Sequence, residues 1–236
     1  MATFNRVLLK LSGEALAGNG ALHSDEVIQE IARQIIDLRE RGVSVGIVIG
    51  GGNIWRGAAN GQIERTISDK IGMLATVVNC LYVSGIFRNE GLSTRVLTPS
   101  AVMDMTESFS KDKAVEYLDR GDIVFFAAGT GNPYFSTDTG VVLRALEVGA
   151  DLVLLAKNID GVYDADPKLV AGASKFETIS LSEVVKRDLR VMDLSATIMA
   201  RDNQVPLRVF SLTEPDSIRK AAGIIDGFSG TTVTVD

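Results

Sequence analysis

Short runs of apolar residues recur along the chain, and several contain almost no polar side chain. They lie at residues 7–11, 43–49, 96–97, 123–128, 152–156, 207–210 and 231–235. A strand with one face in water alternates polar and apolar side chains, whereas a strand of a covered parallel sheet is apolar throughout. These runs therefore predict a largely parallel sheet that is covered on both faces.

Helical patterns separate these runs. Residues 24–41 have apolar side chains at helical spacing, with Ser24 as a candidate N-cap and Gly42 after the last turn. A second pattern covers residues 68–89, and others start near Thr137, Leu181, Ser195 and after Pro215. Because strands and helices alternate, we expect an α/β fold, a three-layer αβα sandwich with a mainly parallel central sheet.

The helix expected at residues 68–89 is apolar around most of its circumference. Its apolar positions are Ile71, Met73, Leu74, Val77, Val78, Leu81, Tyr82, Val83, Ile86 and Phe87. Such a helix is expected to be buried on all sides, either inside a large core or across an interface between subunits. We favour the interface.

Charge and rare residue types exclude several classes of function. The chain of 236 residues has a formal net charge of −6, one cysteine and one histidine. Nucleic acids and anionic membranes are bound by clustered Lys and Arg, so neither partner is expected. Cys80 alone forms no intramolecular disulfide, and His23 alone builds no catalytic triad or multi-histidine metal site. We expect Cys80 to be buried and His23 to lie at the surface.

The N-terminal stretch ends in a small-residue pattern that is typical of signal-peptide cleavage. Lys10 and Glu14 interrupt its apolar part, which is too short and too charged for a signal peptide. No uninterrupted apolar run approaches the roughly 18 residues of a membrane span. We therefore expect a cytoplasmic protein.

Two of the apolar runs end in glycine turns next to a basic side chain. Lys10 lies in the run VLLKL and precedes Ser12 and Gly13. A lysine there either extends its ammonium to the surface or has a buried anionic partner, and the adjacent turn favours a phosphate. The second run leads into GGGNIWRG at residues 50–57, which is either a plain sharp turn or a close approach to a ligand. Arg56 favours the ligand, because a guanidinium binds phosphate oxygens through two hydrogen bonds.

A third turn, GTGNPYFSTD at residues 129–138, has the glycines of a phosphate-binding loop but no lysine. The cation for its anion must therefore come from another strand end. Asp138 is expected in the first turn of the following helix, where it either compensates the helix dipole or holds the ammonium of Lys10. Asp69, near the start of the apolar helix, is either a cap or a ligand contact.

A fourth stretch, AKNIDGVYDADP at residues 156–167, follows another apolar run. Asp-Gly and Asp-Pro form turns, so a structural loop accounts for this stretch. Tyr163 is then either structural or a stacking partner for a purine ring.

Five motifs, in this order, resemble the amino-acid-kinase superfamily, and most closely its bacterial UMP kinases. They are KLSGE, GGGNIWRG, GTGNPYFSTD, IDGVYDADP and the segment VMDLSATIMARDNQVPLRVF at residues 191–210. The resemblance spans essentially the whole chain. It implies the amino-acid-kinase (carbamate-kinase-like) fold and the phosphorylation of UMP by ATP in pyrimidine nucleotide biosynthesis. It further implies one domain with two lobes, 1–150 on the UMP side with the ATP-phosphate loop and 151–236 on the adenosine side.

The resemblance also assigns roles to individual residues. ATP would be bound by Lys10, Leu11, Ser12, Gly13, Gly52, Arg56, Asn158, Tyr163 and Asp166. UMP would be bound by Gly51, Asp69, Thr130, Gly131, Asn132, Pro133, Tyr134, Phe135, Ser136 and Thr137. Lys10, Arg56 and Asp138 would act on the phosphoryl group in transit, with Asp138 positioning Lys10.

Phosphoryl transfer to a nucleoside monophosphate suits these side chains. The attacking phosphate oxygen is largely ionised near neutral pH, since its second pKa is about 6, so no general base is needed. The reaction requires alignment of two anions and stabilisation of charge at a loose transition state. Lysine, arginine, backbone amides and Mg²⁺ delivered with ATP supply both, and no dedicated metal site is expected.

The resemblance implies regulation and assembly as well. Relatives form homohexamers, as trimers of dimers, and are activated by GTP and inhibited by UTP. In some of them an Arg-Asp pair on the long helix belongs to the GTP site, and the aligned residues here are Ser84 and Gly85. Arg95 matches a nearby basic position of that site, and Arg88 lies close to it.

Two other functions remain open. Another kinase of the superfamily would phosphorylate a carboxylate, a carbamate or a small phosphorylated alcohol, and the turn at residues 129–138 favours UMP over these. A nucleotide sensor on the same fold would lack the lysine or the acid of the site, and both Lys10 and Asp138 are present.

Overall fold

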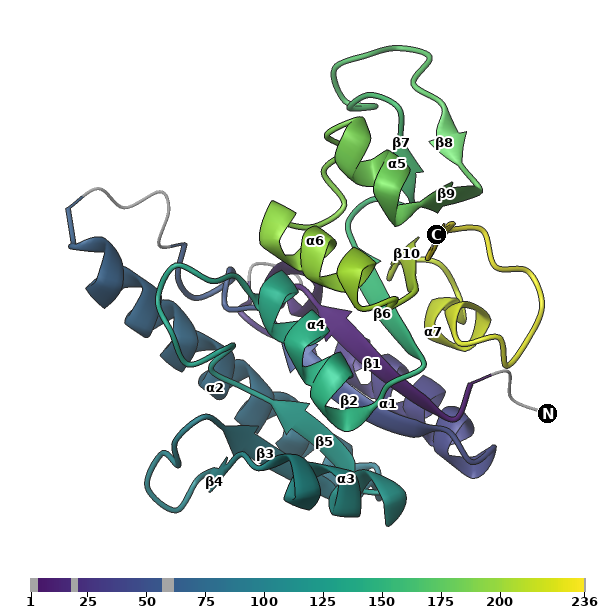
Figure 1. Cartoon of the computed structure of the whole chain (residues 1–236). Helices are drawn as coiled ribbons and strands as arrows, with labels where there is room; N and C mark the ends of the chain where they lie inside the picture. Colours follow the sequence, from purple (N-terminus) through teal and green to yellow (C-terminus); the bar gives the residue numbers. More distant parts are fainter. Residues whose placement is uncertain (1–3, 18–20, 57–61, 236) are drawn as a thin grey trace.

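The computed structural model describes residues 4–17, 21–56 and 62–235, and within them nine strands form one sheet in the order β4-β3-β5-β2-β1-β6-β10-β11-β9 (Figure 1). Neighbouring strands are parallel except for the pair β10 and β11. The strands are β1 (Arg6–Leu11), β2 (Ser44–Ile49), β3 (Thr94–Thr98), β4 (Glu107–Ser108), β5 (Ile123–Phe126), β6 (Leu152–Lys157), β9 (Thr178–Ser180), β10 (Leu207–Ser211) and β11 (Thr231–Thr234). A separate hairpin pairs β7 (Val162–Tyr163) with β8 (Lys175–Phe176).

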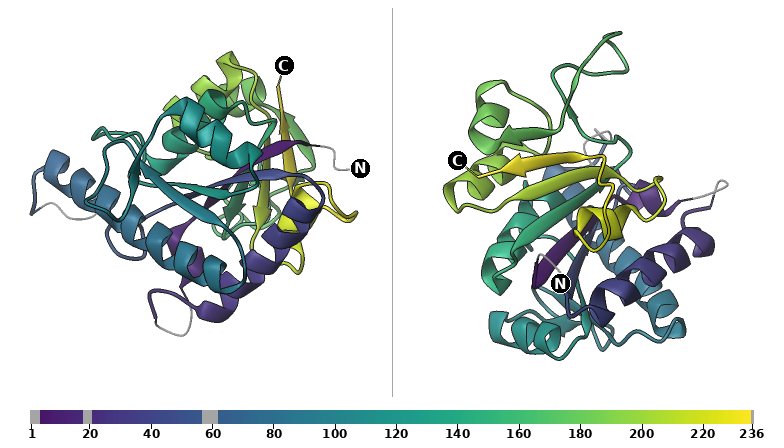
Figure 2. Two further views of the ribbon diagram at one scale, coloured as in Figure 1. Left: turned by 90° about the horizontal axis from the view of Figure 1, so that it is seen from below. Right: turned by 90° about the vertical axis from the view of Figure 1, so that its right-hand side faces the viewer.

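Helices cover both faces of this sheet. One face carries α1 (Asp25–Glu40), α2 (Arg65–Asn89) and α7 (Ser217–Ala221). The other carries α3 (Lys111–Asp119), α4 (Thr137–Val148), α5 (Leu181–Lys186) and α6 (Leu194–Asp202). Figure 2 shows α1 and α2 across the sheet from α4. The predicted three-layer αβα sandwich with a mainly parallel sheet is confirmed.

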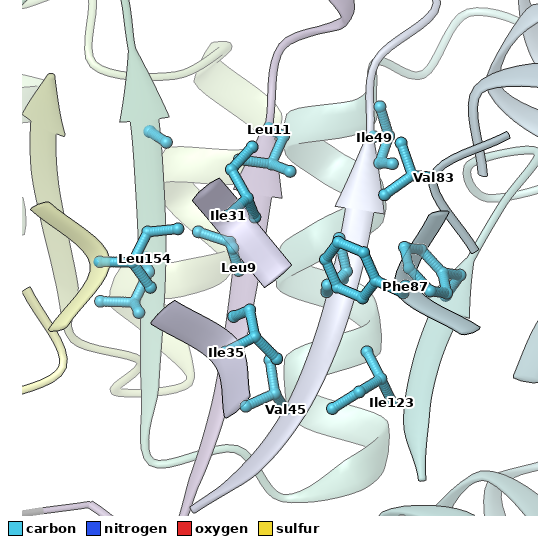
Figure 3. Packing of buried hydrophobic residues seen from close by; sticks show 14 of the residues in the cluster. Leu9, Leu11, Ile31, Ile35, Val45, Ile49, Val83, Phe87, Ile123 and Leu154 are labelled. Carbon is cyan, nitrogen blue, oxygen red and sulfur yellow. The ribbon is translucent and has the colours of Figure 1, made fainter. Parts of the chain in front are cut away.

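The central strand β1 is buried on both faces. Leu9 and Leu11 pack against α1 with Ile31 and Ile35 (Figure 3), whereas Leu8 belongs to the core on the opposite face. Because successive side chains alternate between faces, an uninterrupted apolar run is what a strand between two helical layers requires.

Side-chain caps fix where several helices begin. Ser24 Oγ accepts a hydrogen bond from the amide of Val27 at 3.4 Å, as its position before α1 predicts. Ser136 Oγ accepts from the amide of Asp138 at 2.9 Å and so sets the start of α4. This helix ends at Gly149, whose φ of 66° lies in the left-handed region that glycine favours.

The long helix α2 has one buried face and one exposed face. Val83 and Phe87 are fully buried, and burial raises the pKa of the Cys80 thiol to about 12. The opposite side exposes Ile67, Leu74, Val78 and Tyr82. The core alternative for this helix is therefore wrong, and the interface stays a prediction. Within the described part of the chain, α2 is also long and apolar enough to span a membrane, a property it shares with core helices of soluble proteins.

Candidate active site

Four strands of the sheet end at the same edge, and their following turns lie together there. β1, β2, β5 and β6 run parallel, so their carboxyl ends face one side. The chain leaves β1 for β2 on one side and later returns with β6 on the other, which makes β1 the point where the strand order reverses. Ligands of open α/β sheets bind at such a point.

Lys10 and Asp138 form an ion pair at this edge. Lys10 Nζ lies 2.8 Å from Asp138 Oδ1, and the two side chains are only 11% and 17% exposed. Asp138 reaches Lys10 because the Ser136 cap starts α4 directly behind the third glycine turn. Because little water reaches these side chains to screen their charges, the electrostatic interaction of Lys10 with a ligand beside it is strong.

The first two glycine turns pack against each other so closely that side chains are excluded. A Cβ on Gly13 would lie 2.2 Å from Asn53 Oδ1 and 2.5 Å from the carbonyl oxygen of Gly50. A Cβ on Gly51 would meet α2, 2.9 Å from both Ala75 Cβ and the Gly72 carbonyl oxygen. The amide of Gly50 also donates to the carbonyl of Leu11 at 2.9 Å. Glycine is therefore required for packing at both turns, whatever they bind.

The remaining residues of the first two turns occupy different surroundings. Ser12 Oγ accepts from the amide of Ala15 at 3.2 Å and caps the 3₁₀ turn η1 (Gly13–Leu16), while the side chain of Leu11 is in the core. Gly52 has more room, since a Cβ there would meet only the Glu14 carboxylate, at 3.2 Å. Arg56 is 66% exposed and forms an ion pair with Glu14.

Lys157 is a second lysine at this edge that the sequence analysis missed. It ends β6, and its Nζ donates to the carbonyl of Val191. Burial lowers the pKa of Lys157; the Asp138 carboxylate opposes this shift, and the Lys10 charge adds to it. The signal that pointed to Lys10, a lysine in a buried strand before a turn, is present here too.

Asp69 joins α2 to the third turn rather than capping the helix. Its carboxylate lies 2.9 Å from Arg65 Nε and accepts from the amide of Tyr134 at 2.8 Å. Burial alone would raise the pKa of Asp69, but the Tyr134 amide and the Arg65 guanidinium outweigh it and leave the pKa below its ordinary value. α2 begins at Arg65, a full turn before Asp69, which excludes the cap.

A cavity of about 460 Å³ opens between α2, the third turn and the start of α6. Its lining includes the predicted residues Gly51, Gly52, Asp69, Thr130, Asn132, Tyr134, Phe135, Ser136 and Thr137. Gly131 and Pro133 do not line it. Gly131 shapes the turn instead, with a φ of 82° and Pro99 directly beside it.

The cavity also has walls that were not predicted. Trp55 donates its indole N–H to Ser68 at 3.1 Å. Asp193 accepts from Thr139 at 3.0 Å and from Ser136, and it caps α6 through the amide of Ala196 at 2.9 Å. Nothing in a sequence pattern pairs Asp193 with a turn that lies so far away along the chain.

A second cavity, of about 400 Å³, adjoins the ion pair. Asp138 and Lys157 form one wall, and the segment from α5 to α6, with Arg190 and Met192, forms the other. The two cavities share Asp193 and Leu194, so they adjoin each other, and Asp138 and Lys157 lie on the side of the second cavity.

Tyr163 and Asp166 lie on the hairpin that follows β6. The Tyr163 hydroxyl donates to Asp160 Oδ1 at 2.8 Å, and Lys175 Nζ binds the other oxygen of this carboxylate at 2.7 Å. Asp166 accepts from the amide of Lys168 at 2.9 Å and is exposed. Asn158 is exposed and directly follows β6.

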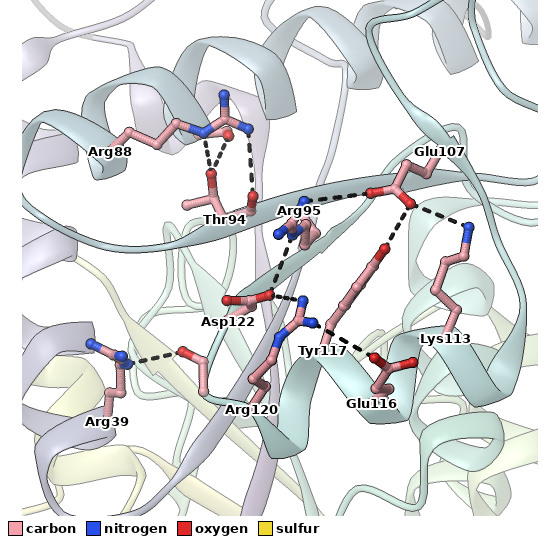
Figure 4. A network of polar contacts seen from close by, with 12 residues as sticks. Arg39, Arg88, Thr94, Arg95, Glu107, Lys113, Glu116, Tyr117, Arg120 and Asp122 are labelled. Carbon is pink, nitrogen blue, oxygen red and sulfur yellow. Dashed lines mark hydrogen bonds and ion pairs between the residues drawn. The ribbon is translucent and has the colours of Figure 1, made fainter.

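Arg88 and Arg95 lie at the opposite edge of the sheet, where β3 and β5 begin. Arg88 Nε donates to Thr94 Oγ1 at 2.6 Å. Arg95 is 3.3 Å from Asp122 and stacks over the ring of Tyr117 (Figure 4). Both guanidinium groups therefore have partners within the chain and are remote from the glycine turns.

Among the described residues, no three His, Cys, Asp or Glu side chains lie close enough together to hold a metal ion. Of the carboxylates that line the cavities, Asp69, Asp138 and Asp193 already bind groups of the protein.

Comparison with known proteins gives consistent matches along the chain. The model of the amino acid kinase family matches residues 5–211. The crystal structure of UMP kinase from Bacillus anthracis superposes with a TM-score of 0.93 and 36% sequence identity, covering 99% of this chain and 97% of that one. UMP kinase from Ureaplasma parvum superposes with a TM-score of 0.91 and 31% identity, covering 98% of each chain.

Proposed function

The chain belongs to the amino acid kinase family, and on this premise we propose that it transfers the γ-phosphoryl group of ATP to UMP, giving ADP and UDP. The observation that carries the proposal is the largely buried ion pair of Lys10 and Asp138, whose carboxylate lines one of two adjoining cavities of nucleotide size. The two similar crystal structures, both of UMP kinases, support the choice of acceptor.

The γ-phosphoryl group moves directly between two phosphate oxygens, and the acceptor oxygen is already ionised. The chain therefore needs no base, and its work is alignment and neutralisation of charge. Lys10, held by Asp138, stabilises the equatorial oxygens as the phosphoryl group moves. Lys157, on the neighbouring strand, adds positive charge close to the same place. Arg56, exposed at the rim beside Glu14, exchanges that partner for phosphate.

UMP occupies the cavity against α2, with Gly51, Asp69 and the lining residues of the third turn around it. ATP places its phosphates on Lys10, residues 11–13 and Gly52, and its adenosine on Asn158, Tyr163 and Asp166. These assignments divide the domain into an acceptor lobe, 1–150, and an adenosine lobe, 151–236. The place of these turns, after the parallel strands β1 and β2 at the carboxyl edge of the sheet, supports the phosphate position, because backbone amides at glycine turns bind anions.

Mg²⁺ enters with ATP and neutralises charge on the transferring phosphates. The residues present fit an ion that is carried by its nucleotide, since the described carboxylates at the site are already bound to Lys10, Ser136 and Thr139. Asp138 and Asp193 are the side chains that would contact its water shell.

The exposed stripe of α2 supports self-association. Ile67, Leu74, Val78 and Tyr82 recur at helical spacing and are each at least 40% exposed. We expect this stripe to pack against the same stripe of a second copy, as in an isologous dimer, and three dimers to form a hexamer in the cytoplasm.

Regulation by GTP and UTP would involve the network around Arg88 and Arg95. Arg88 and Arg95 already bind Thr94 and Asp122, so an effector phosphate must displace these partners. A GTP response therefore involves rearrangement of this network.

An ATP-consumption assay with several acceptors tests the proposal. UMP, CMP, dUMP, acetylglutamate, carbamate and isopentenyl phosphate are each supplied with and without GTP. Turnover mainly on UMP supports the proposal. Turnover on another acceptor would leave the role of Lys10 in place but would show that the UMP contacts are wrongly assigned. Nucleotide binding without turnover would leave a sensor, and the proposal would be wrong.

A further inference from the structure

Asn79 is a fully buried amide in the middle of α2 that no step of the proposed reaction uses. Its side chain is 0% exposed and forms four hydrogen bonds. Nδ2 donates to the carbonyl of Gly50 at 2.7 Å and to Asn53 Oδ1 at 2.8 Å. Oδ1 lies 2.7 Å from His23 Nε2 and accepts from Asn53 Nδ2 at 3.2 Å. A buried polar group with all its bonds made fixes the parts it joins.

Backbone carbonyls determine the orientation of this network. The carbonyl of Gly50 can only accept, so the NH₂ group of Asn79 must face it. Likewise Asn53 Nδ2 donates to the carbonyl of Leu22 at 3.0 Å. The remaining oxygen of Asn79 then faces His23, whose Nε2 must carry a hydrogen. Both the neutral Nε2–H tautomer and the imidazolium meet this requirement.

The joined groups belong to the phosphate end of the site. Gly50 and Asn53 form the second glycine turn, and their oxygens are the atoms that leave no room for a Cβ on Gly13 of the first turn. A shift of Asn79 would therefore move both turns relative to Lys10. His23 is itself fixed, because it stacks on Tyr82 with ring centroids 4.2 Å apart. His23, expected at the surface, is thus half-buried between helix and turn.

We propose that Asn79 is a positioning residue for phosphoryl transfer, and that His23 is its outer anchor. Asn79 holds the second glycine turn against the first, and the His23 hydrogen bond keeps the Asn79 amide aimed at Gly50. The inference rests on the proposed function for its catalytic readout. It concerns mainly the alignment of the ATP phosphates: of the acceptor cavity only the wall made by Gly51 and Gly52 belongs to the turn that Asn79 holds, and Asp69 lies on α2.

Three substitutions at the outer end of the network separate the hydrogen bond from packing. His23→Phe keeps the stack on Tyr82 but removes the donor, and it should lower kcat about fivefold, the effect of one such bond. His23→Gln restores an N–H donor and should recover most of that loss. Tyr82→Phe keeps the ring and removes only the hydroxyl that donates to Asp25 at 2.7 Å, so kcat should not change.

Asn79→Ala tests the centre of the network. It should lower kcat about 10²-fold through misplaced phosphates, while calorimetry shows UMP affinity close to that of the wild type. Hydrogen exchange of the peptide that covers residues 50–56 should become faster in Asn79→Ala and His23→Phe, and that of α1 should not. The exchange measurement needs no turnover. It therefore tests whether Asn79 and His23 hold the second glycine turn in place even where wild-type protein fails to phosphorylate UMP.

The inference is overturned by a folded Asn79→Ala protein with wild-type kcat and unchanged exchange. It is equally overturned when kcat and UMP affinity fall together, or when His23→Gln is no better than His23→Phe. Circular dichroism and a melting curve establish folding, and His23→Phe supplies the same test where Asn79→Ala does not fold.

Discussion

The glycine turns and the β7–β8 hairpin are both assigned to ATP, yet they are built in different ways. At the turns, Gly13 lies against Asn53 and Gly50 so closely that a methyl group is excluded, and α2 closes the back of the second turn. On the hairpin, Tyr163 is held by Asp160 and Lys175 of the same hairpin. Its base is tied to β11 through Thr231, which accepts from the amide of Val162 at 2.8 Å.

This difference indicates how the two ends of ATP are handled. The phosphate end is held by several elements at once, so its geometry is fixed before nucleotide binds. The hairpin is joined to the rest of the domain at its base, through Thr231 and Ser229, and the loop at its tip carries exposed residues such as Leu169. We therefore expect changes at the turns to act on kcat and changes on the hairpin to act on the KM for ATP.

The largest effect is expected at Lys10. Lys10→Ala removes the charge that stabilises the moving phosphoryl group, so kcat should fall about 10³-fold while UMP affinity changes little. Steady-state kinetics and UMP calorimetry measure the two quantities. Lys175→Ala is the matched hairpin variant and should alter kcat less than about fivefold, since it breaks a partly exposed ion pair. Equal loss of kcat and UMP affinity in Lys10→Ala would contradict the assigned role.

Gly13→Ala should have the next largest effect. The added methyl must displace Asn53 and the Gly50 carbonyl, and a shift of the turn should lower kcat/KM for ATP about 10²-fold. Gly85→Ala is a control on the exposed side of α2, where nothing lies within 4 Å of the new Cβ. It should keep the wild-type rate and gain up to about 1 kcal/mol in stability. Wild-type kinetics in Gly13→Ala would show that the tight packing is irrelevant to ATP.

A smaller effect is expected on the hairpin. Tyr163→Ala should raise the KM for ATP by up to about tenfold, the range of one aromatic stacking contact, and leave kcat nearly unchanged. Tyr163→Phe keeps the ring and loses the bond to Asp160, so it separates stacking from hairpin structure. A loss of kcat without a change in the KM for ATP would show that the hairpin acts on the chemical step, as the glycine turns are expected to do.

The smallest effect concerns acid stability at Asp193. Burial raises the pKa of Asp193, but the Ser136 hydroxyl, the amide of Ala196 and the Thr139 hydroxyl lower it more, so it lies below the ordinary 3.8. The unfolded chain then binds its proton at higher pH than the folded chain, and stability is lost as the pH falls below 3.8 through the folded value. Asp193→Asn should flatten this part of the curve of unfolding free energy against pH. An unchanged slope would show that the carboxylate contributes no such linkage.

Much of the fold followed from the sequence because the strands are buried on both faces. The runs at β1, β2 and β6 have no polar face and end in glycine or lysine, which is readable from a few residues. Some of the short elements were not predicted. α3 has only Ala114 and Leu118 fully buried, and β4, β7, β8 and β9 are too short to show a period.

The site was harder to read wherever it depends on contacts across the fold. The pairing of Lys10 with Asp138 was one of two open alternatives, and the structure places the two side chains together. The links of Asp193 to the third turn and of Asn79 to Gly50 join residues without any spacing rule between them. Lys157 was readable by the logic applied to Lys10 and was overlooked.

The central place of β1 has a consequence for the order in which the protein is made. Lys10 stands in register with Val48 on one side and Leu155 on the other, so β1 is synthesised long before its second neighbour, β6. Until β6 emerges, one edge of β1 and its charged side chain stay open. A parallel neighbour so distant in sequence closes slowly. The nascent chain is thus most exposed to mispairing while the segment between β2 and β6 is synthesised, and nucleotide can bind only after that interval.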